Sequence, residues 1–352
     1  MKHLYVHIPF CNSICTYCDF VRFVSCNKEK EEYINKIIKQ IKQKSKNNIY
    51  LTVYIGGGTP NSISDKLLTK LLKCIKKYIN KKTEFTIELN PELITPSQAS
   101  ILKKYSVNRV SIGIQSVDST ILKKYNRSGN IEMYEKAIRT IKKTGIVNIS
   151  CDFIYGFNEG DPEKQIIDDL EFLTKNNINH ASFYSLEVKD NSIIAKQNYV
   201  IDEKRIDNQL LLIEKIMPKK GFERYEVSSW CKNKKYRSKH NIAYWKMEEW
   251  FGIGLGATGF SSKSLLENKG NLKKWETKIK KLNKKECYFY IIMMGLRMID
   301  GIDLKIKNNL LAYKFFKKQL IKTKIENNHL KSTNIDKLNI TLLKCLEKVE
   351  KE

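Results

Sequence analysis

Short apolar runs alternate with longer amphipathic segments from the start of the chain to residue 186. The runs carry the β-branched and aromatic residues typical of strands, and apolar residues at helical spacing follow each of the first five. The predicted strands are Leu4–Ile8, Leu51–Ile55, Phe85–Leu89, Arg109–Ile114, Asn148–Tyr155 and His180–Leu186. Helices are predicted over Glu29–Lys46, from Ser62 or Ser64 to Tyr78, over Ser97–Tyr105, from Ser119, and over Ile131–Thr144 and Pro162–Asn176. This alternation predicts an α/β fold, an open (β/α)6 partial barrel with its site at the carboxyl ends of the strands.

The pattern changes after about residue 195, where the alternation of strands and helices stops. We expect a helix over Glu203–Lys219, a strand over Phe222–Trp230, and helices over Leu272–Leu282 and Glu286–Met298. The Lys/Asn-rich tail beyond Ile302 has apolar residues at helical spacing. The chain is therefore divided into a core (1–195), an extension (196–262) and a smaller, mostly helical module (263–352).

Composition narrows the class of protein. The 352 residues are 41% hydrophobic and carry a net charge of +26. The lysines are spread over every predicted helix rather than gathered in one patch, so no nucleic-acid partner is expected. Nine cysteines without paired spacing, and no signal peptide, predict a reducing cytoplasm. The longest apolar run, Cys287–Leu296, is too short to span a bilayer.

Three cysteines follow the first predicted strand with the spacing C-x3-C-x2-C. They are Cys11, Cys15 and Cys18, and Pro9 ends the strand before them. Thiolates are soft ligands that suit iron–sulfur clusters and zinc. Three on one short loop could hold three corners of a [4Fe–4S] cluster and leave one iron without a protein ligand. Buried or zinc-binding cysteines are the alternative, although the chain has no second C-x2-C pair.

This spacing, with Tyr17 just before Cys18, resembles the cluster loop of radical S-adenosylmethionine (SAM) proteins. The resemblance implies that SAM chelates the open iron and is cleaved to a radical by an electron from the cluster. Gly56-Gly57-Gly58-Thr59-Pro60 is not a P-loop, because no Gly-Lys-Ser/Thr follows. It is similar instead to the radical SAM segment whose backbone binds the SAM amino group. Glycine suits that role because a Cβ would block close approach of the backbone.

Four polar residues stand at or after the ends of consecutive predicted strands: Glu88, Gln115, Arg127 and Asp152. Each alone could be a helix cap or an ion-pair partner. Together they resemble the SAM contacts of the anaerobic coproporphyrinogen III dehydrogenase family. That resemblance implies that Asp152 holds the ribose hydroxyls, with Gln115 and Arg127 at the sugar and carboxylate. It places Tyr5 and Glu88 at a second SAM site.

Two further features distinguish branches of that family. The dehydrogenase branch carries an extra Cys where this chain has Phe20. The Cys18-Asp19-Phe20 ending and the motif His240-Asn241-x-x-Tyr244-Trp245 resemble the HemW-type haem chaperones instead. That resemblance implies a [4Fe–4S] cluster, SAM and haem, an electron donor, and transfer of haem to an acceptor protein. Whether the chain is also an enzyme stays open, and an oxygen-independent coproporphyrinogen III oxidase or another radical SAM enzyme are the alternatives.

The haem ligand is expected to be His240, with Tyr244 as the second candidate, since imidazole and phenolate both bind haem iron. The residues alone favour a packed domain junction, and it is the resemblance that favours haem. Two segments depart from a familiar pattern. The loop Gly156–Gln165 is longer than its family counterpart and lacks an early Pro, and it borders the expected site. Gly254–Gly259 fits G-x-G-x-x-G but lacks a βαβ setting, so we assign it to a turn.

Overall fold

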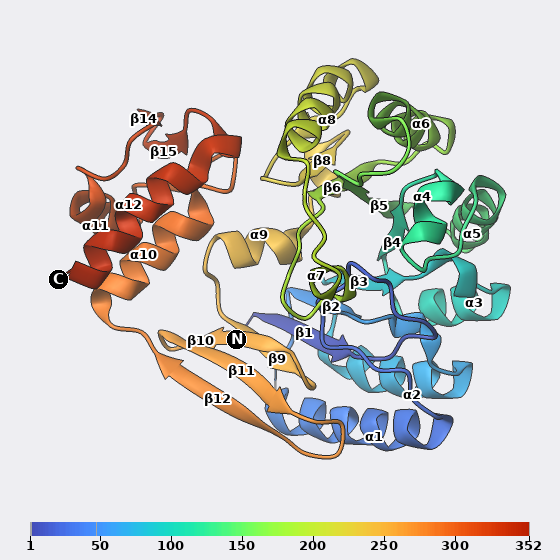
Figure 1. Cartoon of the computed structure of the whole chain (residues 1–352). Helices are drawn as coiled ribbons and strands as arrows, with labels where there is room; N and C mark the ends of the chain where they lie inside the picture. Colours follow the sequence, from blue (N-terminus) through green and yellow to red (C-terminus); the bar gives the residue numbers. More distant parts are fainter. Residues whose placement is uncertain (1, 47, 352) are drawn as a thin grey trace.

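The computed structural model describes residues 2–46 and 48–351 (Figure 1). Six parallel strands lie next to one another in sequence order at the centre of one large sheet. They are β1 (His3–Ile8), β2 (Thr52–Gly57), β3 (Glu84–Leu89), β4 (Arg109–Gln115), β5 (Asn148–Tyr155) and β6 (His180–Ser185). The predicted α/β partial barrel is confirmed, and the carboxyl ends of these strands share one rim.

Helices cover the outer face of these strands (Figure 1). They are α1 (Asn27–Lys44), α2 (Asp65–Ile75), α3 (Pro96–Lys104), α4 (Ser119–Lys124), α5 (Ile131–Lys143) and α6 (Pro162–Lys175). A side-chain oxygen caps the N-terminus of most of these helices, for example that of Ser64 before α2 and that of Asn130 before α5. The apolar stripe of α1, which includes Ile34, Ile37 and Ile41, is fully buried against the sheet. The main hydrophobic core therefore lies between the helices and the sheet.

Antiparallel strands extend both edges of the sheet. Beyond β6, helices α7 (Ile193–Lys196) and α8 (Glu203–Ile216) lead to β7 (Glu223–Arg224) and β8 (Ser229–Cys231). The single strand predicted over Phe222–Trp230 is therefore wrong. The chain turns at Tyr225–Ser228, where the Tyr225 N–H donates to the Ser229 carbonyl at 3.1 Å. Helix α8 ends where Pro218 cannot continue its hydrogen bonding.

At the other edge, helix α9 (Lys239–Trp245) precedes β9 (Trp250–Ile253), which pairs in parallel with β1. The strands β10 (Thr258–Ser261), β11 (Ser264–Gly270) and β12 (Trp275–Lys281) follow in antiparallel order. The turn predicted at Gly254–Gly259 is confirmed over 254–257, where φ is +99° at Gly254 and +81° at Gly256, but Gly259 lies in strand β10. Both values lie in the left-handed region that favours glycine.

The helix predicted over Leu272–Leu282 is wrong, because most of that segment is strand β12. Its apolar residues are three or four apart and so imitate a helical stripe. The Asn271 side chain instead accepts from the Lys274 N–H at 2.9 Å and closes a turn. Trp275 then packs on Tyr33 of α1, with 5.2 Å between ring centroids. The strand's lysines suit a solvated sheet edge.

The C-terminal region has a hydrophobic cluster of its own, formed by residues between Tyr288 and Cys345. Its helices are α10 (Lys284–Gly295), α11 (Lys307–Phe316) and α12 (Leu338–Lys351). They pack together beside a small sheet of β13 (Ile302–Asp303), β15 (His329–Ser332) and β14 (Thr323–Glu326) (Figure 1). The tail is therefore mixed rather than purely helical. The three-part division of the chain stays a prediction. In residues 2–46 and 48–351 no helix has the length and apolar character needed to cross a membrane.

Candidate functional site

The three-cysteine loop lies at the rim, directly after β1. The Cys11 N–H donates to the Phe23 carbonyl at 3.0 Å, which closes the loop at its base. Cys11 is buried, while Cys15 and Cys18 are half-buried. Two donors contact the thiols: the Thr59 hydroxyl lies 3.4 Å from the Cys11 sulfur, and Arg127 Nη1 lies 3.8 Å from the Cys15 sulfur. The loop therefore presents three thiols with stabilising donors close by.

The chemistry of these thiols decides which metal group fits. Burial raises the pKa of Cys11, and it raises that of Cys18 to about 11, so both need a cationic partner to ionise. Among the described residues, no group of three or more His, Cys, Asp or Glu side chains is arranged so that it could bind one metal ion. A [4Fe–4S] cluster binds each thiolate through a different iron, so it does not require that convergence. The donor set fits a cluster better than one zinc ion.

The triple-glycine segment lies against the cysteine loop. Gly58 N–H donates to the Ile8 carbonyl at 2.9 Å, and Thr59 N–H donates to the Phe10 carbonyl at 2.8 Å. A Cβ on Gly58 would lie 2.9 Å from the Cys11 sulfur, closer than real Cβ contacts. Gly57 has a φ of +117°, which a side chain rarely adopts. Glycine is thus required here by close approach and by backbone conformation.

Glu88 anchors this glycine segment to β3. Its two carboxylate oxygens accept from the Tyr54 hydroxyl at 2.8 Å and from the Gly57 N–H at 3.1 Å. Burial raises the pKa of Glu88 to about 7. The carboxylate predicted for a second SAM site therefore contacts the glycine segment itself.

Gln115 is the last residue of β4, and the Arg127 side chain lies beside Gly113 of the same strand. Gln115 has a left-handed φ of +68°, at an irregularity in the pairing of β4 with β5. Arg127 donates to the Gly113 carbonyl and, at 3.2 Å, to the Asn90 side chain. The buried Asp169 of α6 accepts from the Val117 N–H at 2.7 Å and holds the turn that follows Gln115. Asp169, which lies outside β4, therefore stabilises the strained backbone conformation at Gln115.

Asp152 points from β5 toward β4. Its oxygens accept from the Ser111 hydroxyl at 2.7 Å and from the Ser150 hydroxyl at 3.0 Å. Burial raises the pKa of its carboxyl group, and these hydrogen bonds oppose the shift. A carboxylate has about four lone-pair sites, so two such bonds leave acceptor capacity for a ligand hydroxyl.

Tyr17 packs against the loop with the atypical sequence, in a hydrophobic cluster that also includes Ile154 of β5. Its ring lies 6.1 Å from the rings of both Tyr125 and Phe157. The Tyr125 hydroxyl donates to Glu159 at 2.6 Å, and the Arg205 side chain donates to the Glu159 carbonyl at 2.6 Å. The atypical loop is thus tied to the cysteine loop through an aromatic cluster.

A cavity of about 420 Å³ connects the cysteine loop with helix α9. Its size falls within the usual ~300–1,000 Å³ of ligand pockets. The lining combines aromatic rings, two histidines and two carboxylates: Tyr5, His7, Asp19, Phe20, Val21, Tyr54, Glu88, His240, Asn241, Tyr244, Gly256 and Thr258. The cavity therefore brings Tyr5, Glu88, His240 and Tyr244 together, although they are far apart in the sequence.

His240 lies on the cavity wall with both ring nitrogens hydrogen-bonded. Nδ1 lies 2.6 Å from the Thr52 hydroxyl, and Nε2 lies 2.7 Å from the Tyr244 hydroxyl. The ring stacks on Tyr54, with 5.1 Å between ring centroids. The Glu84 carboxylate accepts from the backbone N–H of His240 at 3.0 Å. Burial lowers the pKa of His240 well below its ordinary value. The imidazole is neutral, which is the form that binds a metal.

Sequence reasoning missed His7 and Tyr54, which line the cavity, and Thr52 and Glu84, which are hydrogen-bonded to His240 behind it. A signal was available in the alternation of side chains along a strand. Tyr5 and His7 are two apart on β1, and the Tyr5 hydroxyl lies 3.1 Å from His7 Nδ1. Thr52 and Tyr54 have the same spacing on β2. His7 therefore shares a strand face with Tyr5, and Thr52 shares one with Tyr54.

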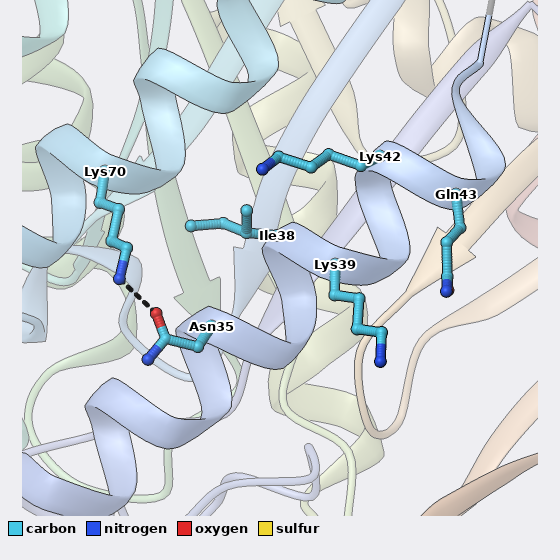
Figure 2. A pocket seen from close by; sticks show the side chains of 6 residues that line it. All are labelled: Asn35, Ile38, Lys39, Lys42, Gln43 and Lys70. Atoms are coloured by element: carbon cyan, nitrogen blue, oxygen red, sulfur yellow. Dashed lines mark hydrogen bonds between the residues drawn. The ribbon is translucent and has the colours of Figure 1, made fainter.

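A second hollow, of about 430 Å³, lies between α1 and α2 on the outside of the barrel (Figure 2). Lys70 donates to the Asn35 side chain at 2.5 Å. Figure 2 shows Lys42 extending beside Ile38, whereas Lys39 points away from it. None of the predicted site residues lines it. The candidate site is therefore the cavity at the rim.

Comparison with known proteins identifies the family. The model of the Radical SAM superfamily matches residues 5–173. The heme chaperone HemW of Lactococcus lactis is 31% identical over 315 residues, covering 85% of this chain and 82% of that protein. The HemW of Buchnera aphidicola from Schizaphis graminum is 34% identical over 265 residues, covering 73% and 69%.

The fold has a counterpart among solved structures. Coproporphyrinogen III oxidase (HemN) from Escherichia coli, a radical SAM enzyme, superposes with a TM-score of 0.82 at 17% identity. The match covers 99% of this chain and 90% of that one, so it extends beyond the barrel to the C-terminal region. At this identity the likeness establishes the fold alone. The sequence relatives and the fold together show that this chain belongs to the radical SAM superfamily and, within it, to the HemW family.

Proposed function

We propose that this protein is a haem chaperone that binds a [4Fe–4S] cluster, SAM and haem, and passes haem to an acceptor protein. One observation carries the proposal: a single cavity is lined both by the cysteine loop, at Asp19, Phe20 and Val21, and by His240 and Tyr244 of α9. A cofactor at the cysteines and a ligand at α9 would therefore be neighbours. The names of the HemW relatives support haem as that ligand.

The cluster is assigned to Cys11, Cys15 and Cys18, and SAM to the strand ends beside them. Gly57, Gly58 and Thr59 offer a close-approach backbone, Gln115 and Arg127 polar side chains, and Asp152 an acceptor for hydroxyl groups. Tyr5 and Glu88 are assigned to a second SAM site, and Tyr17 is assigned to cofactor binding beside Cys18. A bound, reduced cluster supplies an electron, so the proposal includes an electron donor and a reducing cytoplasm. In this assignment the residues of the chain bind, orient and shield these groups.

Haem is assigned to the α9 side of the cavity, with His240 as ligand and Tyr244 as second candidate. The hydrogen bond between them occupies His240 Nε2, so the Tyr244 hydroxyl must move before iron can bind there. Phe20 is 62% exposed beside this cavity and offers apolar area to a porphyrin edge. The anaerobic coproporphyrinogen III oxidase reaction is the rival activity, and Phe20 in place of a further cysteine weighs against it.

An anaerobic hemin titration of reconstituted protein tests the proposal. We expect a Soret band for the wild type, loss of most of it in His240→Ala, and its retention in Tyr244→Phe. The same preparation, given SAM and an electron donor, is expected not to decarboxylate coproporphyrinogen III at an enzymatic rate. A wild type that gives no Soret shift would remove the chaperone assignment. Substantial decarboxylation would favour the oxidase instead.

A further inference from the structure

A continuous row of hydrogen bonds leads to His240 from the far side of β1. Glu248 Oε2 lies 3.1 Å from His3 Nε2, and His3 Nδ1 lies 2.8 Å from the Thr52 hydroxyl. That hydroxyl lies 2.6 Å from His240 Nδ1, and His240 Nε2 lies 2.7 Å from the Tyr244 hydroxyl. Thr52 and His240 are fully or almost fully buried, as is His3. The row therefore links a partly exposed carboxylate to the cavity wall.

Counting protons gives this row a direction. Two neutral imidazoles, one threonine hydroxyl and one phenol carry four protons between them, and the row contains four hydrogen bonds. An ionised carboxylate only accepts, so the His3 proton lies on Nε2 and faces Glu248. His3 Nδ1 then accepts from Thr52, and Thr52 accepts from His240 Nδ1. His240 Nε2 is left with its lone pair, which accepts from Tyr244.

The opposite direction of hydrogen-bond donation is less favourable at both ends of the row. It would place the unprotonated Nε2 of His3 against the Glu248 carboxylate, two acceptors 3.1 Å apart. It would also leave the proton of Tyr244, a half-buried residue of the cavity wall, without an acceptor among the hydrogen bonds of the described residues. Burial lowers the pKa of His3, which supports the neutral rings assumed in this count.

We propose that Glu248, His3 and Thr52 form a relay that fixes His240 as its Nδ1–H tautomer and keeps Nε2 available as the haem ligand. In this arrangement Tyr244 covers Nε2 until haem displaces its hydroxyl. The three relay residues are positioning residues, since they act on haem only through His240. A hydrogen-bonded Nδ1–H also makes the opposite nitrogen a stronger donor to iron. The part that concerns haem rests on the proposed function, whereas the tautomer does not.

The tautomer is tested in haem-free protein. The chain has five histidines, so ¹⁵N-histidine labelling gives few signals, and a His240→Gln variant assigns those of His240. We expect a protonated, pyrrole-type Nδ1 and an unprotonated, pyridine-type Nε2 for His240. For His3 we expect the proton on Nε2. A proton on His240 Nε2 in the wild type would overturn the relay, whatever the protein does with haem.

Hemin titration then tests the effect on the ligand. Thr52→Val keeps the shape of the side chain but removes the hydroxyl, and we expect hemin to bind about 10- to 100-fold more weakly. Thr52→Ser keeps the hydroxyl and should bind as the wild type does. Cluster content and thermal unfolding, measured for both variants, separate this effect from misfolding. Unchanged binding in a folded Thr52→Val would overturn the relay while leaving haem binding intact. A wild type that binds no hemin would instead remove the proposed function.

Discussion

The cysteine loop and helix α9 border the same cavity, but they hold their reactive groups in different ways. Cys15 and Cys18 are half-buried, and the donors Thr59 and Arg127 lie 3.4 Å and 3.8 Å from the sulfurs of the loop. His240 is fully buried, and short hydrogen bonds engage both of its ring nitrogens. A cluster that binds the loop thus displaces only weak sulfur contacts. A ligand that binds His240 must displace the partly buried Tyr244 hydroxyl from Nε2, at a cost of about 0.5–1.5 kcal/mol, the net value of a typical hydrogen bond. The difference suits a resident cofactor at the loop and an exchangeable cargo at α9.

The largest expected effect comes from removing one thiol of the loop. Cys15→Ala should lose most of the iron and sulfide from anaerobically reconstituted protein, because two thiolates leave a second iron without a protein ligand. Cys26→Ala is the matched control, since Cys26 is an exposed thiol before α1 in the same part of the chain. Iron and sulfide analysis measures both. A cluster retained in Cys15→Ala and lost in Cys26→Ala would show that the loop has been misassigned.

The second prediction concerns a substitution that crowds the cysteine loop but keeps all three thiols. Gly58→Ala would place a Cβ 2.9 Å from the Cys11 sulfur and 3.0 Å from the Phe10 carbonyl. We expect reduced cluster content and weaker SAM binding, because backbone atoms cannot move aside as a flexible side chain can. Gly221→Ala serves as the control, since a Cβ there meets nothing within 4 Å. It has a left-handed φ of +78°, so it should cost about 1 kcal/mol of stability and leave the cluster intact. Equal cluster loss in both variants would argue against close approach as the reason for Gly58.

A smaller effect is expected at the strand ends. Asp152→Ala should weaken SAM binding by about 1–3 kcal/mol, the usual cost of losing a buried hydrogen bond to a charged group. Asp168→Ala removes a more exposed carboxylate of α6 that pairs with Lys164 at 2.6 Å, and it should leave SAM binding unchanged. Calorimetry gives the affinities, and the EPR spectrum of the reduced cluster reports whether SAM contacts it. An Asp152→Ala variant with wild-type affinity would remove this residue from the SAM site.

The sequence predicted the loop better than it predicted α9, for a physical reason. The six central strands and the cysteine spacing are local patterns, and local patterns determine where each strand ends. The relay to His240 joins residues from β1, β2 and the segment after α9, so no local pattern contains it. The helix predicted over Leu272–Leu282 failed for a related reason. Packing of Trp275 on α1, a contact between distant segments, outweighed a spacing that imitates a helix.

Glu88 belongs to both halves of the comparison, because it holds the Gly57 N–H of the loop side and lines the cavity beside His240. Burial raises its pKa from 4.5 to about 7. A carboxyl group with a higher pKa in the folded state binds its proton more tightly there. Its contribution to stability is therefore full below pH 4.5 and is lost as the pH rises from 4.5 to 7.

Glu88→Gln isolates this contribution, because the amide stays neutral over the whole range. We expect the wild type to lose stability relative to Glu88→Gln between pH 4.5 and 7, and to keep a constant difference above that range. Denaturant unfolding of cluster-free protein at several pH values measures the difference, and Glu276→Gln, an exposed carboxylate on β12, is the control. Parallel stability profiles for the wild type and Glu88→Gln would mean that Glu88 has the same pKa in the folded protein as in the unfolded chain. Glu88 would then be more hydrated than its burial implies. The half-buried cysteine loop and the buried His240 would differ less in their exposure to water at Glu88, the residue that connects them.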